Sequence, residues 1–402
     1  MSKFRNFHDV PVLSLNDLVA QGDIELGRGN IISKVDIKGC PGLFPIYSSS
    51  SKNNGMMGSY GHYMFDEEMV TWSVDGGGTF FYRPKHKFSV TNVSGYMRAN
   101  QVRFDYRFLH AVLDYQHSFL NFDYQSKAHP SVIREIYEIP IPALREQKKI
   151  ASILTSVDEV IETTQQQIEK LQDLKRGTIN ELLTKGIGNT EFKASEVGKI
   201  PKTWEVKKLQ DCCELITNGF VGATRGIYEE NGVPYLLCQN VRPNHFVDEV
   251  FKYISYEFHQ KNKRSQLLEG DVLTVQTGAG NGDTCVVPKK YEGSNCHALI
   301  VSRTRKEILN PYFLSTFMAS DRGKNRIEVI STGGAHPHLN TTELRKEYVP
   351  VPALQEQTEI IKVVNSINNS LINKNSKLVQ TQSLKKSLMQ DLLTGKVRVQ
   401  VN

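Results

Sequence analysis

The sequence predicts an α+β chain of two tandem globular modules, each followed by a long helix. The two helices are expected to pair as an intramolecular antiparallel coiled coil. A repeated motif, a heptad pattern after each copy and short strand-like runs before each copy support this fold class. The motif I-P-I-P-A-L-R-E-Q occupies residues 139–147 and returns as V-P-V-P-A-L-Q-E-Q at residues 349–357. An ungapped repeat at a constant offset indicates an internal duplication.

Composition allows two packed domains and excludes some classes of protein. The 402 residues are 39% hydrophobic and 9% aromatic, which is enough for packed cores. No apolar run reaches the 18 or so residues of a membrane span, and the N-terminus does not resemble a signal peptide, so we expect a cytoplasmic protein without a membrane partner. The six cysteines form no C-x-x-C pair and are expected to be reduced. A net charge of +6 favours a polyanionic partner.

The first module is predicted at residues 1–138. Strand-like runs at residues 44–47, 69–72 and 79–82 alternate with turn signals, the last two flanking the glycine run at 76–78. This pattern is typical of an α+β domain with loops at the strand ends.

The first repeated helix is predicted within residues 139–186. Prolines cannot lie inside a helix, so it begins only after Pro142, and Gly186 is a plausible stop. Core positions recur in steps of four and three residues, which is the seam of a coiled coil. Polar residues interrupt the seam at Thr164, Lys175 and Thr178, and such interruptions commonly fix register and partner choice. The apolar seam residues are Ile150, Leu154, Val157, Ile161, Ile168, Leu171 and Leu182.

The second half repeats this order. A linker at 187–194 precedes a second module at 195–348, with strand-like runs at 233–237, 271–275 and 284–288. A second helix at 349–396, beginning after Pro352 and stopping near Gly395, precedes a tail at 397–402. Lys374, Lys385 and Thr381 interrupt its seam. Its apolar seam residues are Ile360, Val364, Ile367, Leu371, Leu378, Leu388 and Leu392. Helices of this length also suit a coiled coil between identical chains. Pairing of the two helices within one chain would instead make a molecular ruler, which fixes the distance between the two modules.

Catalytic motifs are missing from the sequence. No G-x-x-x-x-G-K-[ST] loop occurs, so ATP hydrolysis by this chain is not expected. The run at 310–313 is similar to the N-P-P-[YF] loop of adenine methyltransferases but lacks its second proline, and a helix begun by Pro311 is the simpler interpretation. His336 and His338 have no third ligand at a metal-binding spacing. We therefore expect no catalytic site, no metal and no cofactor in this chain.

The modules instead carry side chains suited to DNA. Arginine pairs with guanine, asparagine or glutamine pairs with adenine, and lysine, serine and backbone amides hold phosphates. The candidates in the first module are Ser48, Ser49, Lys52, Asn53, Asn54, Tyr60, His62, Lys85, Arg98 and Asn100. Those in the second are Thr224, Arg225, Gln239, Asn240, Arg242, Gln276, Thr277, Lys289, Asn295, His297, His336 and His338. Any one cluster also fits an ordinary polar loop; their recurrence in both halves favours DNA.

This arrangement resembles the specificity subunit of type I restriction–modification systems over essentially the whole chain. The resemblance rests on the two helices that begin with P-A-L-x-E-Q and on the variable module that precedes each of them. The first module lacks the tryptophan found at Trp204 of the second. The resemblance implies two target-recognition domains that each bind half of a bipartite site in double-stranded DNA. It also implies that the helices dock two methyltransferase subunits carrying S-adenosylmethionine, with restriction subunits using ATP and Mg as further partners, and that this subunit is not itself an enzyme.

Two other functions remain open from the sequence. A coiled-coil scaffold would assemble protein partners without reading DNA specifically, and a self-sufficient enzyme would turn over alone. Under the DNA hypothesis, Arg225, Arg242, Gln239 and Gln276 read bases. The three lysines Lys52, Lys85 and Lys289 hold phosphates.

Overall fold

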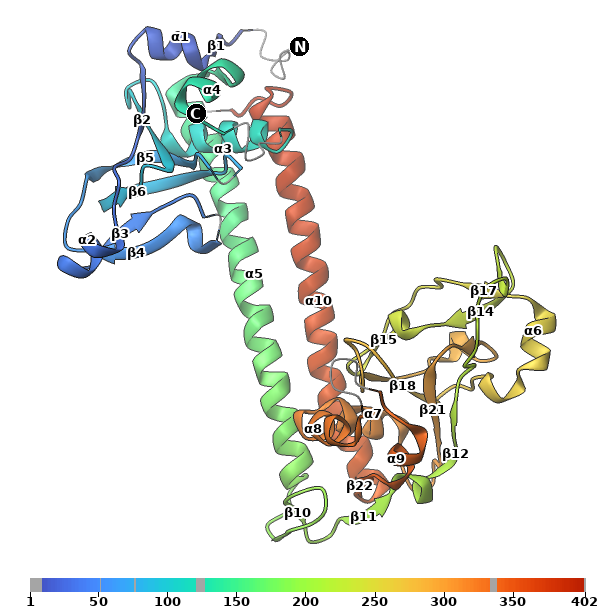
Figure 1. The fold of residues 1–402 in the computed structure, drawn as a ribbon. Coiled ribbons are helices and arrows are strands. Elements are labelled where there is room, and N and C mark those ends of the chain that lie inside the picture. Colours follow the sequence, from blue (N-terminus) through green and yellow to red (C-terminus); the bar gives the residue numbers. More distant parts are fainter. Residues whose placement is uncertain (1–8, 51, 76, 121–126, 333–337, 401–402) are drawn as a thin grey trace. The chain divides into compact units, whose positions relative to one another are not determined.

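The computed structural model describes residues 9–50, 52–75, 77–120, 127–332 and 338–400. The chain divides into two compact units, each built from one module and parts of both long helices (Figure 1). Unit 1 comprises residues 1–166 and 376–402, and unit 2 comprises residues 167–375. No helix in the described ranges is both long and apolar enough to cross a membrane.

Unit 1 is built on a six-stranded sheet in the order β2-β7-β5-β6-β3-β4. Neighbouring strands are antiparallel except β3 and β6, which are parallel. The strands are β2 (Ile24–Arg28), β3 (Phe44–Tyr47), β4 (Met56–Tyr60), β5 (Phe65–Ser73), β6 (Phe80–Val90) and β7 (Ser94–Ala99); the short turn η1 (Lys52–Gly55) joins β3 to β4. A separate pair, β1 (Val12–Ser14) and β8 (Glu138–Pro140), closes the unit beside the helix motif.

Four short helices accompany this sheet, and local signals explain where they begin. They are α1 (Leu15–Ala20), α2 (Lys34–Gly39), α3 (Tyr106–His117) and α4 (Pro130–Ile136). The carboxylate of Asp105 caps α3 by accepting hydrogen bonds from the amides of Arg107 and Phe108, and Pro130 opens α4. The α3 core residues pack against Trp72, whose indole N–H donates to the carbonyl of Ala128 at 2.7 Å.

Unit 2 repeats four consecutive strands of the unit 1 sheet, counted from its β2 edge. The order β12-β21-β18-β19 corresponds to β2-β7-β5-β6, and every pair is antiparallel. These strands are β12 (Cys213–Asn218), β18 (Val272–Val275), β19 (Thr284–Val286) and β21 (Leu299–Thr304). The two modules therefore share a scaffold of four strands.

The remaining strands of unit 2 differ from unit 1. A second sheet has the order β13-β17-β14-β20, and three further pairs are β9 with β10, β11 with β22, and β15 with β16. Their bounds are β9 (Phe192–Lys193), β10 (Ile200–Pro201), β11 (Glu205–Lys208), β13 (Tyr228–Glu229), β14 (Val233–Leu236), β15 (Val241–Arg242), β16 (His245–Phe246), β17 (Tyr253–Ile254), β20 (Asn295–Cys296) and β22 (Tyr348–Val351). Strand β9 falls inside the predicted linker 187–194, which therefore contains paired backbone.

The helices of unit 2 are α6 (Tyr256–Lys261), α7 (Pro311–Ala319), α8 (Asp321–Ile330) and α9 (Thr341–Lys346). Short 3₁₀ turns lie at η2 (Leu209–Cys212), η3 (Cys238–Asn240), η4 (Lys263–Ser265) and η5 (Lys289–Tyr291). As expected from the sequence, α7 begins at Pro311, with Asn310 as its N-cap. Figure 1 shows α7, α8 and α9 gathered near the long helices within this unit.

The long helices are α5 (Leu144–Lys185) and α10 (Leu354–Leu393). Both begin two residues after the second proline of their motif, as predicted. Gly186 and Gly395 follow their ends with φ of 62° and 73°, a left-handed conformation that glycine adopts readily. All the predicted apolar seam residues are buried or half-buried.

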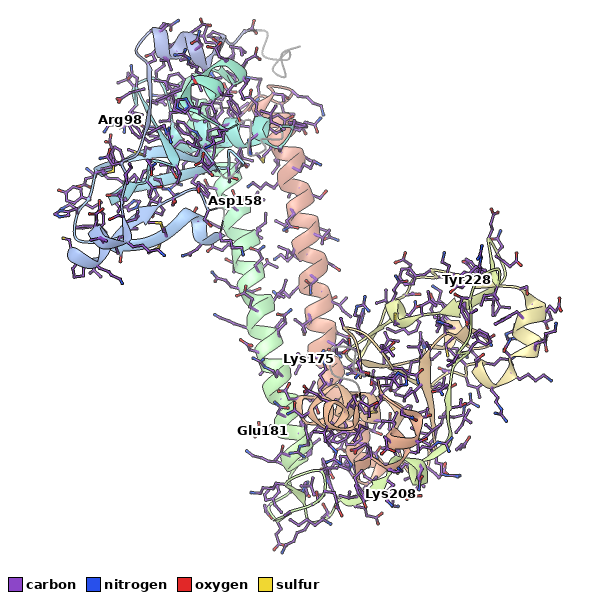
Figure 2. The ribbon with its side chains drawn as sticks, in the orientation of Figure 1. Arg98, Asp158, Lys175, Glu181, Lys208 and Tyr228 are labelled. Atoms are coloured by element: carbon purple, nitrogen blue, oxygen red, sulfur yellow. The ribbon has the colours of Figure 1, made fainter. Side chains whose placement is uncertain are left out.

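Contacts inside each unit show that α5 and α10 run antiparallel. In unit 1, Asp158 of α5, which is labelled in Figure 2, pairs with Lys385 of α10 at 2.7 Å. In unit 2, Gln167 of α5 accepts a hydrogen bond from Lys374 of α10 at 2.6 Å. As the residue number rises from 158 to 167 along α5, the number of the contacting residue on α10 falls from 385 to 374. The predicted intramolecular antiparallel pair is therefore confirmed.

Candidate nucleic-acid interface

The glutamine of the repeated motif makes the same three hydrogen bonds in both units. Gln147 accepts from the amide of Asp105 at 3.0 Å and donates to the carbonyls of Arg103 and Pro142, both at 2.9 Å. Both motif glutamines are fully buried. In unit 2, Gln357 accepts from the amide of Asn310 at 2.7 Å and donates to the carbonyls of Ile308 and Pro352 at 2.9 and 2.8 Å. Because Asp105 and Asn310 are the N-caps of α3 and α7, this glutamine joins each module to its long helix.

The glutamate of the motif holds the segment that follows the other long helix. In unit 1, Glu146 forms a bidentate ion pair with Arg398, in which both N···O distances are 2.8 Å. The guanidinium of Arg398 is the main reason that the pKa of Glu146 lies below its ordinary value.

In unit 2, the corresponding Glu356 accepts from the amide of Ile187 at 2.8 Å and from the indole of Trp204 at 2.9 Å. The motif is therefore a joint that fixes where each module meets the helix pair. Sequence analysis found the repeat but not these bonds.

In unit 1 the structure brings five of the candidate DNA residues together on the connection between β3 and β4. Lys52, Asn53 and Asn54 form the exposed turn η1, in which both asparagines have positive φ, 49° and 51°. Ser48 and Ser49 lie before it, half-buried; the hydroxyl of Ser48 accepts from Thr91. His62 and Lys85 are exposed on other segments of the same unit.

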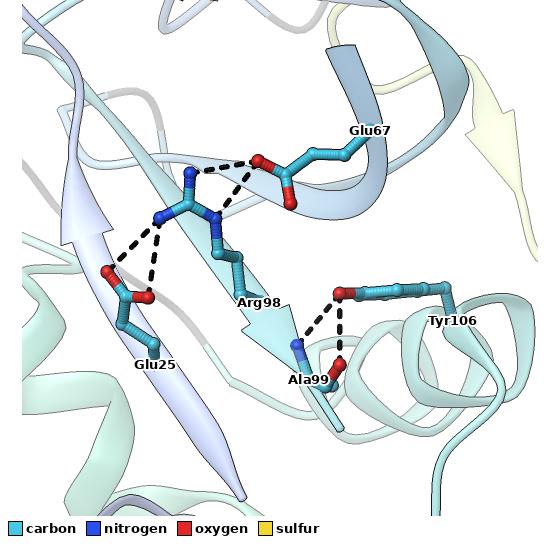
Figure 3. A network of polar contacts seen from close by, with 5 residues as sticks. All are labelled: Glu25, Glu67, Arg98, Ala99 and Tyr106. Atoms are coloured by element: carbon cyan, nitrogen blue, oxygen red, sulfur yellow. Dashed lines mark hydrogen bonds and ion pairs between the residues drawn. The ribbon is translucent and has the colours of Figure 1, made fainter. Parts of the chain in front are cut away.

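Three other candidates of unit 1 are occupied by intramolecular contacts, which corrects their interpretation. Arg98 pairs with Glu67 at 2.8 Å and with Glu25 at 3.3 Å, as Figure 3 shows, and these carboxylates raise the pKa of its guanidinium, Glu67 most strongly. A guanidinium between two carboxylates is a poor ligand for DNA phosphate. Asn100 donates to Asp23 at 3.2 Å and accepts from Val102 in a tight turn. Tyr60 is buried, with its hydroxyl on Ser89.

In unit 2 six of the eleven candidates that lie in the described residues are exposed. Arg242 lies at the hairpin of β15 and β16, where one terminal nitrogen donates to the carbonyl of Val241 at 2.8 Å. His297 is half-buried beside Phe220, and burial lowers its pKa. Thr224 is also half-buried. Arg225, Gln239, Thr277, Lys289 and His338 are exposed, and His336 lies outside the described residues.

Three amides of unit 2 belong to the core rather than to a surface. Asn240 is fully buried, accepts from Leu237 and donates to the carbonyls of Val247 and Glu249. Asn295 is equally buried, and its side chain is hydrogen-bonded to the ring of His259 and to the hydroxyl of Ser265. Gln276 is 4% exposed and donates to Asn218 at 2.8 Å. Because a buried amide with satisfied bonds cannot also read a base, the predictions for Asn240 and Asn295 are withdrawn. The burial of Gln276 and its bond to Asn218 disfavour base reading by its amide.

From the basic run at 83–87 of β6, only Lys85 was selected as a candidate DNA contact, and the structure separates Lys87 from Arg83. Lys87 is exposed, with its ammonium 4.7 Å from the ring centre of Tyr63, and Arg83 is buried against Tyr47. The run R-P-K-H-K at 83–87 was visible as basic. What it could not show is which of these side chains point into the unit.

The polar seam positions differ between the units. Lys385 pairs with the carboxylate of Asp158. In the duplication Lys175 is equivalent to Lys385, and the uncharged Asn368 is equivalent to Asp158. Figure 2 labels Asp158 and Lys175 on α5. Burial lowers the pKa of the half-buried Lys175. Thr164 is satisfied within its own helix, since its hydroxyl donates to the carbonyl of Val160 at 2.7 Å. The prediction that these residues set register stays a prediction.

Comparison with known proteins identifies the family. The family described as "Type I restriction modification DNA specificity domain" matches residues 14–173 and again 201–381. A type I restriction enzyme specificity subunit, MjaVIII, from Methanocaldococcus jannaschii is 27% identical, with 98% of this chain and 96% of the relative covered. The MjaIX specificity subunit of that organism is 25% identical over 67% of this chain and 62% of the relative.

Two solved structures share the fold. The S subunit of a type I restriction–modification system from M. genitalium has a TM-score of 0.59 at 14% identity, covering 97% of this chain and 98% of that one. A chain from a study of complex assembly and conformational transition of the type I system has a TM-score of 0.56, also at 14% identity, covering 96% and 98%. The duplicated units, their motif joints and these matches lead to one conclusion: the chain belongs to the type I restriction–modification DNA specificity family.

Proposed function

We propose that this chain is the sequence-specific DNA-reading subunit of a type I restriction–modification complex, with each unit reading one half of a bipartite site. The observation that carries the proposal is the duplication of a whole domain together with its connection to a long helix. The same four-stranded scaffold, the same motif glutamine and the same family match occur once in each unit. Two copies of one domain joined by helices suit two separated half-sites.

Exposed polar and basic side chains are the proposed DNA contacts. In unit 1 these are Lys52, Asn53, Asn54, His62 and Lys85; in unit 2 they are Arg225, Gln239, Arg242, Thr277, Lys289 and His338. Lysines on phosphates would supply most of the affinity. Arginine and glutamine at base edges would supply about 1–3 kcal/mol of discrimination per well-read base pair.

The complex is proposed to divide the work among its subunits. Two methyltransferase subunits dock on the helix pair and carry S-adenosylmethionine, and restriction subunits, where present, use ATP and Mg. This chain then needs no catalytic residue of its own. Support comes from the family and from the solved relative described in terms of complex assembly. Purified chain that methylates or cleaves DNA alone would contradict this division.

The experiment that tests the function is single-molecule sequencing of genomic DNA. A host expressing this chain with its methyltransferase subunit is compared with a host expressing the methyltransferase subunit alone. We expect methylated adenine in a split motif only when the chain is present. A stable complex without any new motif would instead favour the scaffold function.

The helix pair is proposed to set the spacer between the half-sites. Inserting one heptad after residue 165 and another after residue 375, which are matched by the duplication, lengthens the pair by about 10 Å. Because base pairs rise about 3.4 Å each, the recognised spacer should grow by about three base pairs. An insertion at only one of the two points serves as the control, since it breaks the register and should abolish methylation. An unchanged spacer in the double variant would refute the ruler.

A further inference from the structure

Arg83 of β6 is a buried arginine without a counter-charge. It is 1% exposed and pairs in register with Met69 of β5. Its guanidinium carbon lies 3.6 Å from the ring centre of Tyr47, and its Nε donates to the hydroxyl of Thr71 at 3.0 Å. Within the described residues, Nη1 has no hydrogen-bond partner and no carboxylate reaches the side chain. Burial lowers the pKa of Arg83 to about 10, so the group is still charged at neutral pH.

The fold does not require an arginine at this position, because unit 2 is built without one. The run M-V-T-W at 69–72, which precedes the glycine run at 76–78, parallels the run V-L-T-V at 272–275, which precedes Gly278. On this parallel Thr71 corresponds to Thr274, and the partner of Met69 corresponds to the partner of Val272. That partner is Val286, an apolar residue in the core of unit 2. The hydroxyl of Thr274 is satisfied there by Thr284 rather than by an arginine. Packing alone therefore does not account for the buried charge in unit 1.

Arg83 lies directly beneath the exposed turn that carries the proposed DNA contacts of unit 1. A Cβ placed on Gly55 would lie 3.2 Å from Nη2 of Arg83, so the turn Lys52–Gly55 covers the guanidinium. Two successive asparagines in that turn, Asn53 and Asn54, hold left-handed backbone, which costs free energy for residues other than glycine. The turn is closed by the bond from the amide of Ser48 to the carbonyl of Gly55 at 2.8 Å and by the bond from the amide of Lys52 to the hydroxyl of Ser50 at 3.1 Å. Contacts with DNA would have to offset the loss of any of these bonds when the turn opens.

We propose that Arg83 is a specificity-determining residue of unit 1, which reads a G·C pair of the first half-site once the turn Lys52–Gly55 moves aside on DNA. This inference rests on the proposed function. Nη1 of Arg83 has no hydrogen-bond partner within the described residues, and once the turn moves aside the two terminal nitrogens can face O6 and N7 of guanine. The guanidinium is planar by its own delocalisation, and its contact with the ring of Tyr47 limits how it can turn. DNA would supply the acceptor that Nη1 lacks within the described residues.

The test compares Arg83→Val, the residue that unit 2 uses, and Arg83→Met, which keeps the length of the side chain, with wild type. The control is Arg134→Met, an exposed arginine of α4 whose described ion pair joins only its neighbour Glu135. Adenine methylation is mapped by sequencing in a host that supplies the methyltransferase subunit, and thermal unfolding is measured on the free chain.

We expect both Arg83 variants to lose about 5- to 150-fold in discrimination at one G·C position of the first half-site. The second half-site should be unchanged, and the Tm should not fall, because an uncompensated buried charge has been removed. The inference is overturned if both variants still recognise the wild-type first half-site, or if methylation of all sequences weakens alike. It is also overturned if the Tm of both variants is lower than that of the wild type. Failure of the wild-type chain to direct a split motif would instead overturn the proposed function.

Discussion

Replacing the buried motif glutamine of unit 2 tests the joint between module and helix. Gln357→Leu removes three hydrogen bonds and leaves the amide of Asn310 and the carbonyls of Ile308 and Pro352 without their partner. Each unsatisfied backbone group costs about 1–3 kcal/mol, less where water can reach it. Counting about 1 kcal/mol for each group gives a loss of about 3 kcal/mol.

Thermal unfolding and hydrogen exchange measure this loss. For a unit of this size, about 3 kcal/mol lowers Tm by about 6–12 °C. Exchange should increase at the start of α7, where the amide of Asn310 loses its acceptor, and should stay unchanged in unit 1. Gln147→Leu should give the mirror result, with faster exchange at the start of α3.

The matched control is Gln355→Leu on the same turn of α10. Gln355 is exposed and makes only a weak contact of 3.3 Å with Glu359. Its replacement should change stability by no more than about 0.5 kcal/mol. Equal Tm values for Gln357→Leu and Gln355→Leu would refute the reasoning that the buried glutamine joins the module to its helix.

Three further predictions concern charges. Asp158→Asn removes the partly exposed pair with Lys385 and should cost at most about 0.5 kcal/mol in urea unfolding, so a loss several times larger would contradict a surface pair. Because Arg398 lowers the pKa of Glu146, their pair stabilises the fold above the ordinary value of 4.5 and is lost as pH falls below it. Glu146→Gln should therefore show a shallower loss of stability below about pH 4.5, and an identical acid profile would disprove this. Lys52→Ala should weaken DNA binding alike for all sequences and reduce the slope of log K against log salt by about one; a changed motif would show base reading instead.

Sequence analysis predicted those features that local pattern determines. The ends of the long helices followed from Pro142, Gly186, Pro352 and Gly395, and all six predicted strand runs coincide with strands. These features depend on backbone geometry and on the alternation of apolar residues, both of which are readable in a short window.

The status of individual polar side chains could not be predicted, because distant residues decide it. Arg98 is neutralised by Glu25, 73 residues away in the chain, and Asn240 is satisfied by backbone groups of a folded loop. Arg83 belongs to the basic run at 83–87, and only the folded structure shows that its side chain is buried. Composition identifies groups that suit DNA, but only the fold shows which of them remain available.

Exchanging one reading module tests the central claim most directly. Residues 195–348 are replaced by the corresponding segment of a type I specificity subunit whose target is known, and adenine methylation is mapped by single-molecule sequencing. We predict that one half-site becomes that of the donor, while the other half-site and the spacer stay as in the parent. Changes in both half-sites, or in neither, while the complex with the methyltransferase still forms, would contradict the claim that each unit reads its own half of the site.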